Sequence, residues 1–181
     1  MKNFIHAFLI TTIAAAILPA CAGCTLVNKI ALPPTPPKDA VILFDGTDFS
    51  QWKPERGGGI KWTIEDGVMT VVPRSGSIVT KRDFRDFRLH LEFNIPERSP
   101  RYKGQARGNS GIYIQKRYEV QILDSYGLEP TFDGCGSLYR ARTPDKNACK
   151  KPGEWQTYDI IFREPRWHDT ERGPEKRGSK G

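Results

Sequence analysis

The chain has 181 residues, of which 28 are basic and 21 acidic, and its formal net charge is +7. Hydrophobic residues make up 38% and aromatic residues 10% of the sequence, which excludes a collagen, a coiled coil and a chain disordered throughout. Because a domain has about 150 residues, the length predicts one domain with appendages. The charge is modest and spread along the chain, without interleaved aromatic residues, so nucleic acid is not a predicted partner.

Residues 1–20 are organised as an export signal, with a positive charge at Lys2 and an apolar run from Phe4 to Leu18. The run is shorter than the about 20 apolar residues that a membrane-spanning helix needs. We therefore predict a cleaved signal peptide and an exported protein. Plain secretion and an uncleaved anchor are the alternatives.

The end of this segment, Leu18-Pro19-Ala20-Cys21, resembles a bacterial lipobox, in which the cysteine becomes the lipidated first residue of the mature protein. Cys24 is a second candidate for lipidation. Prolines recur in residues 21–40 and favour an extended tether. The sequence thus predicts a periplasmic or cell-envelope lipoprotein whose only membrane contact is its lipid anchor.

Cys135 and Cys149 are the cysteines that remain after these two. Because an exported protein meets an oxidising compartment, we predict a disulfide between them. Closing a loop of about 15 residues in this way would add about 3 kcal/mol to the stability of the fold. Two buried thiols and half of a metal site are the alternatives, and no histidine neighbours either cysteine in the sequence.

From Val41 onward, apolar residues alternate with polar ones in short runs that Gly, Pro, Asp and Ser clusters separate. No run of ten or more residues has a helical period, so we predict an all-β sandwich or jelly roll over residues 41–163. The expected strands are 41–44, 60–64, 67–72, 77–80, 86–95, 111–115, 119–124, 136–140 and 154–162.

Alternation also predicts a polar face on this sandwich. In strand 87–95, His90 and Glu92 alternate with apolar residues that face the core. In segment 111–124, a three-residue turn at 116–118 would pair like residues with like. The polar face of that hairpin then carries Tyr113, Gln115, Glu119 and Gln121. A solvated outer face is the ordinary interpretation, but planar hydrogen-bonding groups beside an aromatic ring also suit a sugar.

Loop 96–109 carries four basic residues, Arg98, Arg101, Lys103 and Arg107, against Glu97. The ordinary interpretation is a solvated loop. The alternative is a rim over the site that meets an anionic or polar glycan.

Several motifs together resemble one bacterial family, that of the 3-keto-disaccharide hydrolases, also described as 3-keto-glucoside lyases and hydratases. The most specific motifs are Gly108-Asn109-Ser110-Gly111-Ile112-Tyr113 and Glu119-Val120-Gln121-Ile122-Leu123-Asp124. Further motifs are Leu43-Phe44-Asp45-Gly46, Trp62-Thr63-Ile64-Glu65-Asp66-Gly67, Phe87-Arg88-Leu89-His90-Leu91-Glu92-Phe93 and Pro152-Gly153-Glu154-Trp155-Gln156. The resemblance covers about residues 40–163 and implies a concanavalin A-like jelly roll that is exported and often tethered.

The resemblance implies cleavage of a sugar that is oxidised at C3. A base takes the acidified C2 proton, the glycosidic oxygen leaves C1, and water adds to the enone, which completes a net hydrolysis. Glu119 and Glu92 are the expected base and acid, in either order. The expected substrate-binding residues are Gln121, Asn109, Tyr113, His90 and Asp124.

Two of these residues keep alternatives open. His90 is an acid, a donor to the ketone or a ligand to a divalent metal. Asp124 lies off the alternation, so it either joins the face through a bulge or ends the strand as a turn former.

After Phe162-Arg163 the resemblance ends, and we expect a polar disordered tail over residues 164–181 in place of the C-terminal strands of the family. A non-catalytic carbohydrate-binding lipoprotein and an inactive fragment are therefore the alternative functions. The partners that the resemblance implies are a carbohydrate substrate and an upstream sugar 3-dehydrogenase.

Overall fold

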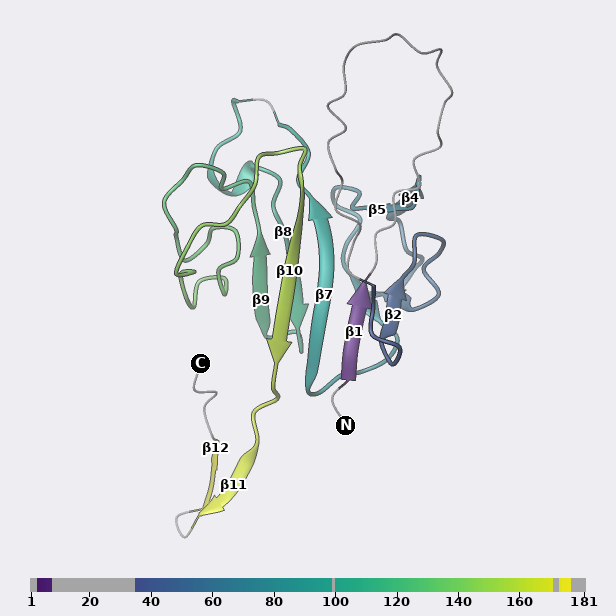
Figure 1. The fold of residues 1–181 in the computed structure, drawn as a ribbon, viewed down its shortest axis with the longest axis vertical. Coiled ribbons are helices and arrows are strands. Elements are labelled where there is room, and N and C mark those ends of the chain that lie inside the picture. The colour runs from purple at the N-terminus through teal and green to yellow at the C-terminus, as the bar shows by residue number, and fades with distance from the viewer. Residues whose placement is uncertain (1–2, 8–34, 99, 171–172, 177–181) are drawn as a thin grey trace. The chain divides into compact units, whose positions relative to one another are not determined.

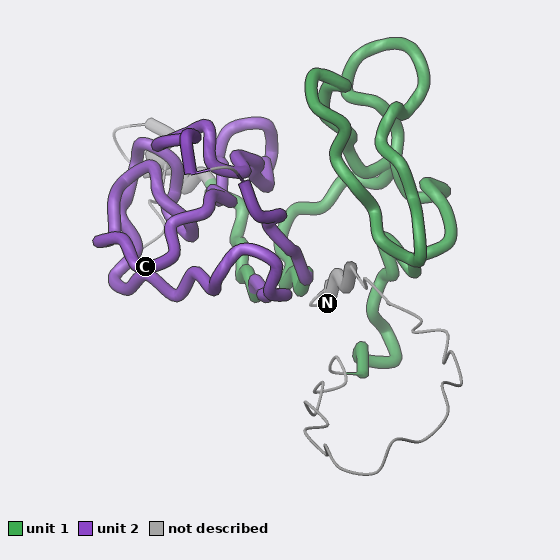
Figure 2. The backbone as a smooth tube through the Cα atoms, turned by 90° about the horizontal axis from the view of Figure 1, so that it is seen from above, with its two compact units in different colours: residues 1–91, 159–181 green, residues 92–158 purple. Residues whose placement is uncertain are grey.

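The computed structural model describes residues 3–7, 35–98, 100–170 and 173–176. The chain divides into two compact units, one of residues 1–91 and 159–181 and the other of residues 92–158 (Figure 2). Among the described residues, no helix is long and apolar enough to cross a membrane. Most of the predicted signal peptide, Cys21, Cys24 and the tether up to residue 34 lie outside the described residues.

The described residues form an all-β fold, as the alternation predicts, in which a single 3-10 helix, η1, occupies Gly104–Ala106 (Figure 1). The ends of seven strands lie within three residues of the ends of a predicted run, and an eighth strand, β2 (Val41–Phe44), has the predicted bounds. They are β2, β4 (Thr63–Glu65), β5 (Val68–Thr70), β6 (Ile78–Thr80), β7 (Phe87–Asn94), β8 (Ser110–Ile114), β9 (Tyr118–Ile122) and β10 (Trp155–Phe162). Before β10, two strands have no counterpart among the predicted runs, β1 (Asn3–Ala7) and β3 (Trp52–Pro54).

The largest sheet has the strand order β10-β7-β1-β2, and β1 runs parallel to both of its neighbours. In the first unit, β3 pairs with β6 and β4 pairs with β5, each antiparallel. The β4–β5 turn contains Asp66 and Gly67, both with positive φ. Two successive left-handed residues give the primed turn whose twist matches that of the flanking strands.

The core side of β7 is as predicted, because Leu89, Phe93 and Ile95 are buried. In the second unit, the Phe93 ring packs against Tyr158 of β10 with a centroid distance of 4.6 Å. His90 differs from its predicted place on a solvated face, since only 8% of it is exposed. Its ring is covered on the side where Nδ1 meets Asp159 of the neighbouring strand β10, in the same unit.

The β8–β9 hairpin has its predicted three-residue turn, but the turn lies one residue earlier, at 115–117. Gln115 and Lys116 both have positive φ, and Arg117 N donates to Ile114 O, so a primed turn forms before Tyr118. The predicted register is therefore wrong by two residues, which leaves the faces unchanged. Tyr113 pairs with Glu119 and Gly111 with Gln121, whereas Gln115 lies in the turn.

Residues 136–140 do not form the predicted strand. Gly136 has positive φ, which interrupts the extended backbone, and only an isolated bridge joins Leu138 to Val120. The segment still covers the outer edge of β9, because Gln121 N donates to Ser137 O and Tyr139 N donates to Glu119 O, at 3.0 and 2.9 Å. β9 is thus flanked by β8 and by this segment.

Within the predicted polar tail, β11 (Trp167–Thr170) and β12 (Gly173–Lys176) pair antiparallel. They form a sheet of their own, apart from the sheets of the sandwich strands.

Candidate functional site

Tyr113 and Glu119 form the centre of the polar face on the β8–β9 hairpin. The Tyr113 hydroxyl donates a hydrogen bond of 2.7 Å to Oε2 of Glu119 across the ladder. Tyr113 is 60% exposed, so the pair is open to a ligand. A carboxylate that accepts from a phenol can take a proton from a substrate while the phenol orients it.

Gly111 provides the space in which the Glu119 carboxyl lies. A Cβ atom placed on Gly111 would collide with the Oε1 atom of Glu119. Since Gly111 is the register partner of Gln121, Glu119 is its diagonal neighbour on the same face. The glycine in the Asn-Ser-Gly motif is thus explained by the packing of the carboxylate, without any need for an unusual backbone conformation.

Three amide side chains meet at the other end of the hairpin. Gln121 Nε2 and Asn109 Nδ2 both donate to Gln105 Oε1, at 2.9 and 2.8 Å. Gln105 Nε2 in turn donates to Asp133 O at 2.9 Å. The structure therefore brings together two predicted binding residues, Asn109 and Gln121. Gln105 was not predicted, because it lies in η1, where no alternation marks its direction.

Gln121 is the most enclosed member of this amide cluster, with 0% of its surface exposed. Its Oε1 atom has no hydrogen-bond partner within the described part of the chain. An unpaired buried acceptor costs about 1–3 kcal/mol, so this oxygen is a strong site for a donor from a buried water.

Asp124 ends its strand, which is the second of its two predicted alternatives. Its Oδ2 atom accepts from Arg107 Nε and Nη2 at 3.0 and 2.6 Å, and Oδ1 accepts from Tyr126 N at 3.3 Å. Only 5% of Asp124 is exposed. The carboxylate is therefore occupied in holding the Arg107 guanidinium and the turn that follows β9.

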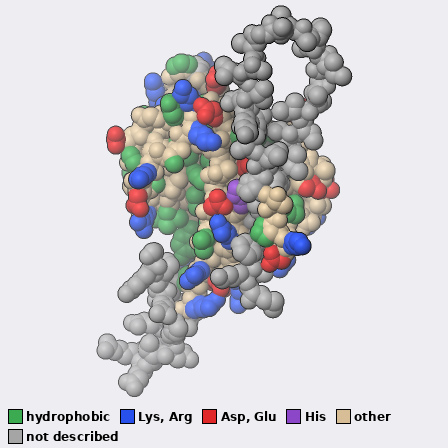
Figure 3. All heavy atoms as spheres, in the orientation of Figure 1, with side chains coloured by type: hydrophobic (Ala, Val, Ile, Leu, Met, Phe, Trp, Pro, Cys, Tyr) green, Lys and Arg blue, Asp and Glu red, His purple; other side chains and the backbone are tan. Residues whose placement is uncertain are grey.

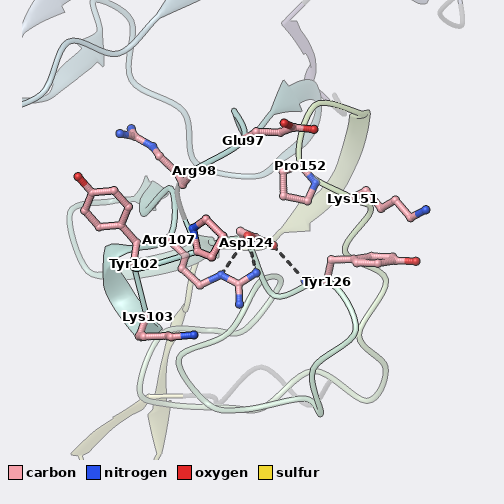
Figure 4. A pocket seen from close by; sticks show the side chains of 10 residues that line it. Glu97, Arg98, Tyr102, Lys103, Arg107, Asp124, Tyr126, Lys151 and Pro152 are labelled. Atoms are coloured by element: carbon pink, nitrogen blue, oxygen red, sulfur yellow. Dashed lines mark hydrogen bonds and ion pairs between the residues drawn. The ribbon is translucent and has the colours of Figure 1, made fainter.

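Arg107 and Asp124 line a cavity of about 460 Å³ in the second unit (Figure 4). Tyr102 and Tyr126 lie on opposite sides of the ion pair in this view. Lys151 Nζ lies over the Tyr126 ring at 5.7 Å from its centroid. The lining residues are Glu97, Arg98, Pro100, Tyr102, Lys103, Arg107, Asp124, Tyr126, Lys151 and Pro152.

Glu92 and His90, the other two residues with an expected role in the reaction, both lie on β7. Glu92 is half-buried, and no hydrogen bond or ion pair among the described residues joins it to Glu119. His90 belongs to the first unit, where its Nδ1 atom lies 3.0 Å from Asp159 Oδ1. The roles assigned to these two residues stay predictions.

Cys135 and Cys149 are both free thiols in the structure. The hydrogen bond from Cys149 lowers the pKa of Cys135 to about 6, and the same bond raises the pKa of Cys149. The Tyr158 hydroxyl lies 3.1 Å from Cys135 Sγ and 2.6 Å from Gln121 O. The predicted disulfide stays a prediction.

Across the described ranges, no three His, Cys, Asp or Glu side chains are grouped to hold a metal ion.

Acidic and basic side chains are interspersed on the face that Figure 3 shows, in agreement with the modest and distributed net charge.

Among solved structures, the chain is similar to a crystal structure from Parabacteroides distasonis that is described as a "putative glycosyl hydrolase". The two sequences are 39% identical, and the TM-score of the two folds is 0.65. The match covers 84% of this chain and 72% of that one. A second structure from this organism, with the same description, has 23% identity and a TM-score of 0.52, covers 77% and 73%, and shows the likeness of fold alone. No curated protein of similar sequence was found. Residues 39–170 match the 3-keto-alpha-glucoside-1,2-lyase-like domain, beyond the expected end of the resemblance at 163, and the chain therefore belongs to this family.

Proposed function

We propose that the protein cleaves 3-keto-glucosides or 3-keto-disaccharides by elimination and hydration. Membership of the family and likeness to a glycosyl hydrolase-like structure make it a sugar-active, hydrolase-like protein. The finer proposal is supported by a single observation, the exposed Tyr113–Glu119 pair beside an amide cluster that has an unpaired acceptor.

The first step of the proposed reaction is the removal of a proton from C2 of the sugar by a base. A ketone at C3 acidifies the hydrogen at C2, because the resulting carbanion is shared with the carbonyl. Removal of this proton forms the C1–C2 double bond and breaks the bond from C1 to the glycosidic oxygen, which takes up a proton. Addition of water across the double bond restores the 3-keto sugar with a hydroxyl at C1.

Glu119 is the proposed base. The Tyr113 hydroxyl fixes one carboxylate oxygen, and the space above Gly111 leaves room for the other. Glu92 is the proposed partner that protonates the leaving oxygen, with the order of the two carboxylates open. Asn109, which is exposed, is proposed to bind a sugar hydroxyl directly, and Gln121, which is fully buried and lacks a donor at Oε1, is proposed to bind one through a bridging water.

The test is the turnover of a nitrophenyl 3-keto-α-glucoside, which is measured by the absorbance of the released nitrophenol. We expect Glu119→Gln to lower kcat by about a hundredfold or more, as loss of a general base does. Glu129→Gln, at an exposed loop position, is the matched control and should leave turnover unchanged. Equal turnover of Glu119→Gln and the wild type would remove Glu119 from the reaction.

Deuterium incorporation separates elimination from ordinary glycoside hydrolysis. In D₂O, the elimination route places deuterium at C2 of the released sugar, whereas direct displacement at C1 leaves C2 untouched. The product must be analysed after a single turnover, because a 3-keto sugar slowly exchanges this hydrogen on its own. An enzyme-free sample held for the same time measures that background.

A further inference from the structure

The cavity lined by Arg107 and Asp124 is distinct in its residues from the Tyr113–Glu119 pair and the amide cluster. None of its ten lining residues is Tyr113, Glu119, Gln121 or Asn109. Four of them are basic and two are acidic, Arg98, Lys103, Arg107 and Lys151 against Glu97 and Asp124. The cavity therefore has a positive balance that the proposed reaction does not use.

The buried ion pair leaves most of this positive charge available. Asp124 neutralises Arg107 but engages only Nε and Nη2, so Nη1 has no hydrogen-bond partner in the described residues. Arg98, Lys103 and Lys151 make no ion pair with any described residue. A guanidinium that is held in place on one side presents its remaining N–H groups in a fixed direction, which suits the oxygens of a carboxylate or of a tetrahedral oxyanion.

The two tyrosines give the cavity an apolar component. Tyr102 and Tyr126 lie on either side of the Arg107–Asp124 pair in Figure 4, and a cation lies over each ring, Arg101 at 5.1 Å and Lys151 at 5.7 Å from the centroid. Small-molecule sites combine aromatic walls with a few placed polar groups, in volumes of about 300–1,000 Å³. The cavity volume of about 460 Å³ is within that range and accommodates a sugar ring.

The same two chain segments carry this cavity and the amide cluster. Gln105 lies in η1 and Arg107 directly after it, whereas Gln121 lies in β9 and Asp124 two residues after the end of that strand. The backbone joins them, because Asp124 N donates to Arg107 O at 2.9 Å. A group that is bound in the cavity would therefore contact the same two segments that carry Gln105 and Gln121.

We propose that this cavity binds the anionic substituent, a carboxylate or a sulfate, of an acidic saccharide. The choice of a saccharide rests on the proposed sugar-active function, whereas the choice of an anion rests on the unpaired cations alone. The substrate class then becomes a glycoside or oligosaccharide that carries a uronate or a sulfated sugar beside the bond to be cleaved.

Binding is tested by calorimetry on the Glu119→Gln variant, so that turnover does not consume the ligand. The probes are methyl glucuronide, glucose 6-sulfate, methyl glucoside and inorganic sulfate. We expect the acidic sugars to bind at least tenfold more tightly than methyl glucoside, with an affinity that falls as salt is added. Tighter binding of the glucuronide identifies a carboxylate site, and tighter binding of the sulfated sugar identifies a sulfate site.

The double variant Arg98→Gln/Lys151→Gln should weaken binding of the acidic sugars by tenfold or more and leave methyl glucoside unaffected. Lys146→Gln, an exposed position outside the cavity, is the matched control. Equal binding of acidic and neutral sugars, or inorganic sulfate binding as tightly as the acidic sugars, would overturn the proposal. Turnover of a neutral 3-keto-glucoside by the wild type reports on the proposed reaction separately, since it does not require this cavity.

Discussion

The hydroxyl of Tyr113 donates to Oε2 of Glu119 directly across the β8–β9 ladder. Two residues earlier in β8, on the same face, Gly111 leaves room for the carboxyl. A hydrogen bond to a charged acceptor contributes about 1.5–3 kcal/mol. The position of the carboxylate is therefore set by one neighbouring side chain and by one missing side chain.

Replacement of Tyr113 by Phe tests the first of these effects. We expect kcat on a 3-keto-glucoside to fall by about tenfold, which corresponds to about 1.4 kcal/mol, because the carboxylate loses its orienting donor. Denaturant unfolding should shift little, since Tyr113 is largely exposed. An unchanged kcat would show that the phenol is dispensable for the reaction.

Gly111→Ala tests the second effect. The added methyl group displaces the Glu119 side chain, so we expect a strong loss of kcat together with a destabilisation of about 1–3 kcal/mol from overpacking. Gly59→Ala is the control, because a Cβ at Gly59 meets nothing within 4 Å. Crystallography or NMR of Gly111→Ala would have to show Glu119 in a new rotamer; an unmoved carboxylate contradicts this explanation.

Asp124→Asn should destabilise the protein by about 3 kcal/mol, since it leaves the partly buried Arg107 guanidinium without its counter-charge. The double variant Asp124→Asn/Arg107→Gln should recover part of this loss. Chemical denaturation of the two single variants and the double variant measures the coupling, and strictly additive effects would contradict it.

The thiol pair leads to a prediction on pH. Since the pKa of Cys135 is lowered to about 6, its thiolate is the dominant form at neutral pH and is lost as the pH falls through 6. We expect exchange with a small disulfide reagent to proceed at pH 7 and to slow about tenfold for each pH unit below 6. Mass spectrometry then detects an intramolecular Cys135–Cys149 disulfide, which Cys149→Ser replaces by a mixed disulfide.

The lipid anchor is tested in a bacterial host. The wild type should fractionate with membranes and take up a labelled fatty acid, and Cys21→Ala should do neither. Cys24→Ala is the matched control, and a label that follows Cys24 would assign the anchor to the second candidate.

Alternation was a reliable guide wherever a strand is long and buried on one side. In β7, Leu89 and Phe93 are buried as predicted, because a slip by one residue would expose the whole apolar face. In β8 the exposed Tyr113 and the buried Ile114 follow the predicted faces, whereas in β9 the buried residue is Gln121, which the alternation had placed on the polar face. The predicted register of the β8–β9 hairpin was wrong, because a shift of two residues leaves an alternating pattern unchanged. The pattern also gives no information on the left-handed turn at Gln115 and Lys116.

The site depends on contacts that no pattern in the sequence records. Gln105 reaches Gln121 from η1, and Arg107 reaches Asp124 across 17 positions of the chain. His90 was assigned to the solvated face by its polarity, whereas its pairing with Asp159 allows it to be buried. Such partners come from loops and neighbouring strands, and single-strand alternation gives no information on them.

The segment 136–139 that lies along β9 has a consequence for solubility. Free strand edges recruit other chains into intermolecular sheets, and polypeptides commonly protect them by covering or charging the edge. Because Ser137 and Tyr139 already engage the backbone of Gln121 and Glu119, the strand that carries the proposed base has no open side for a foreign strand to join. The outer edge of β9 is thereby protected against intermolecular strand pairing by a segment that is not itself a strand.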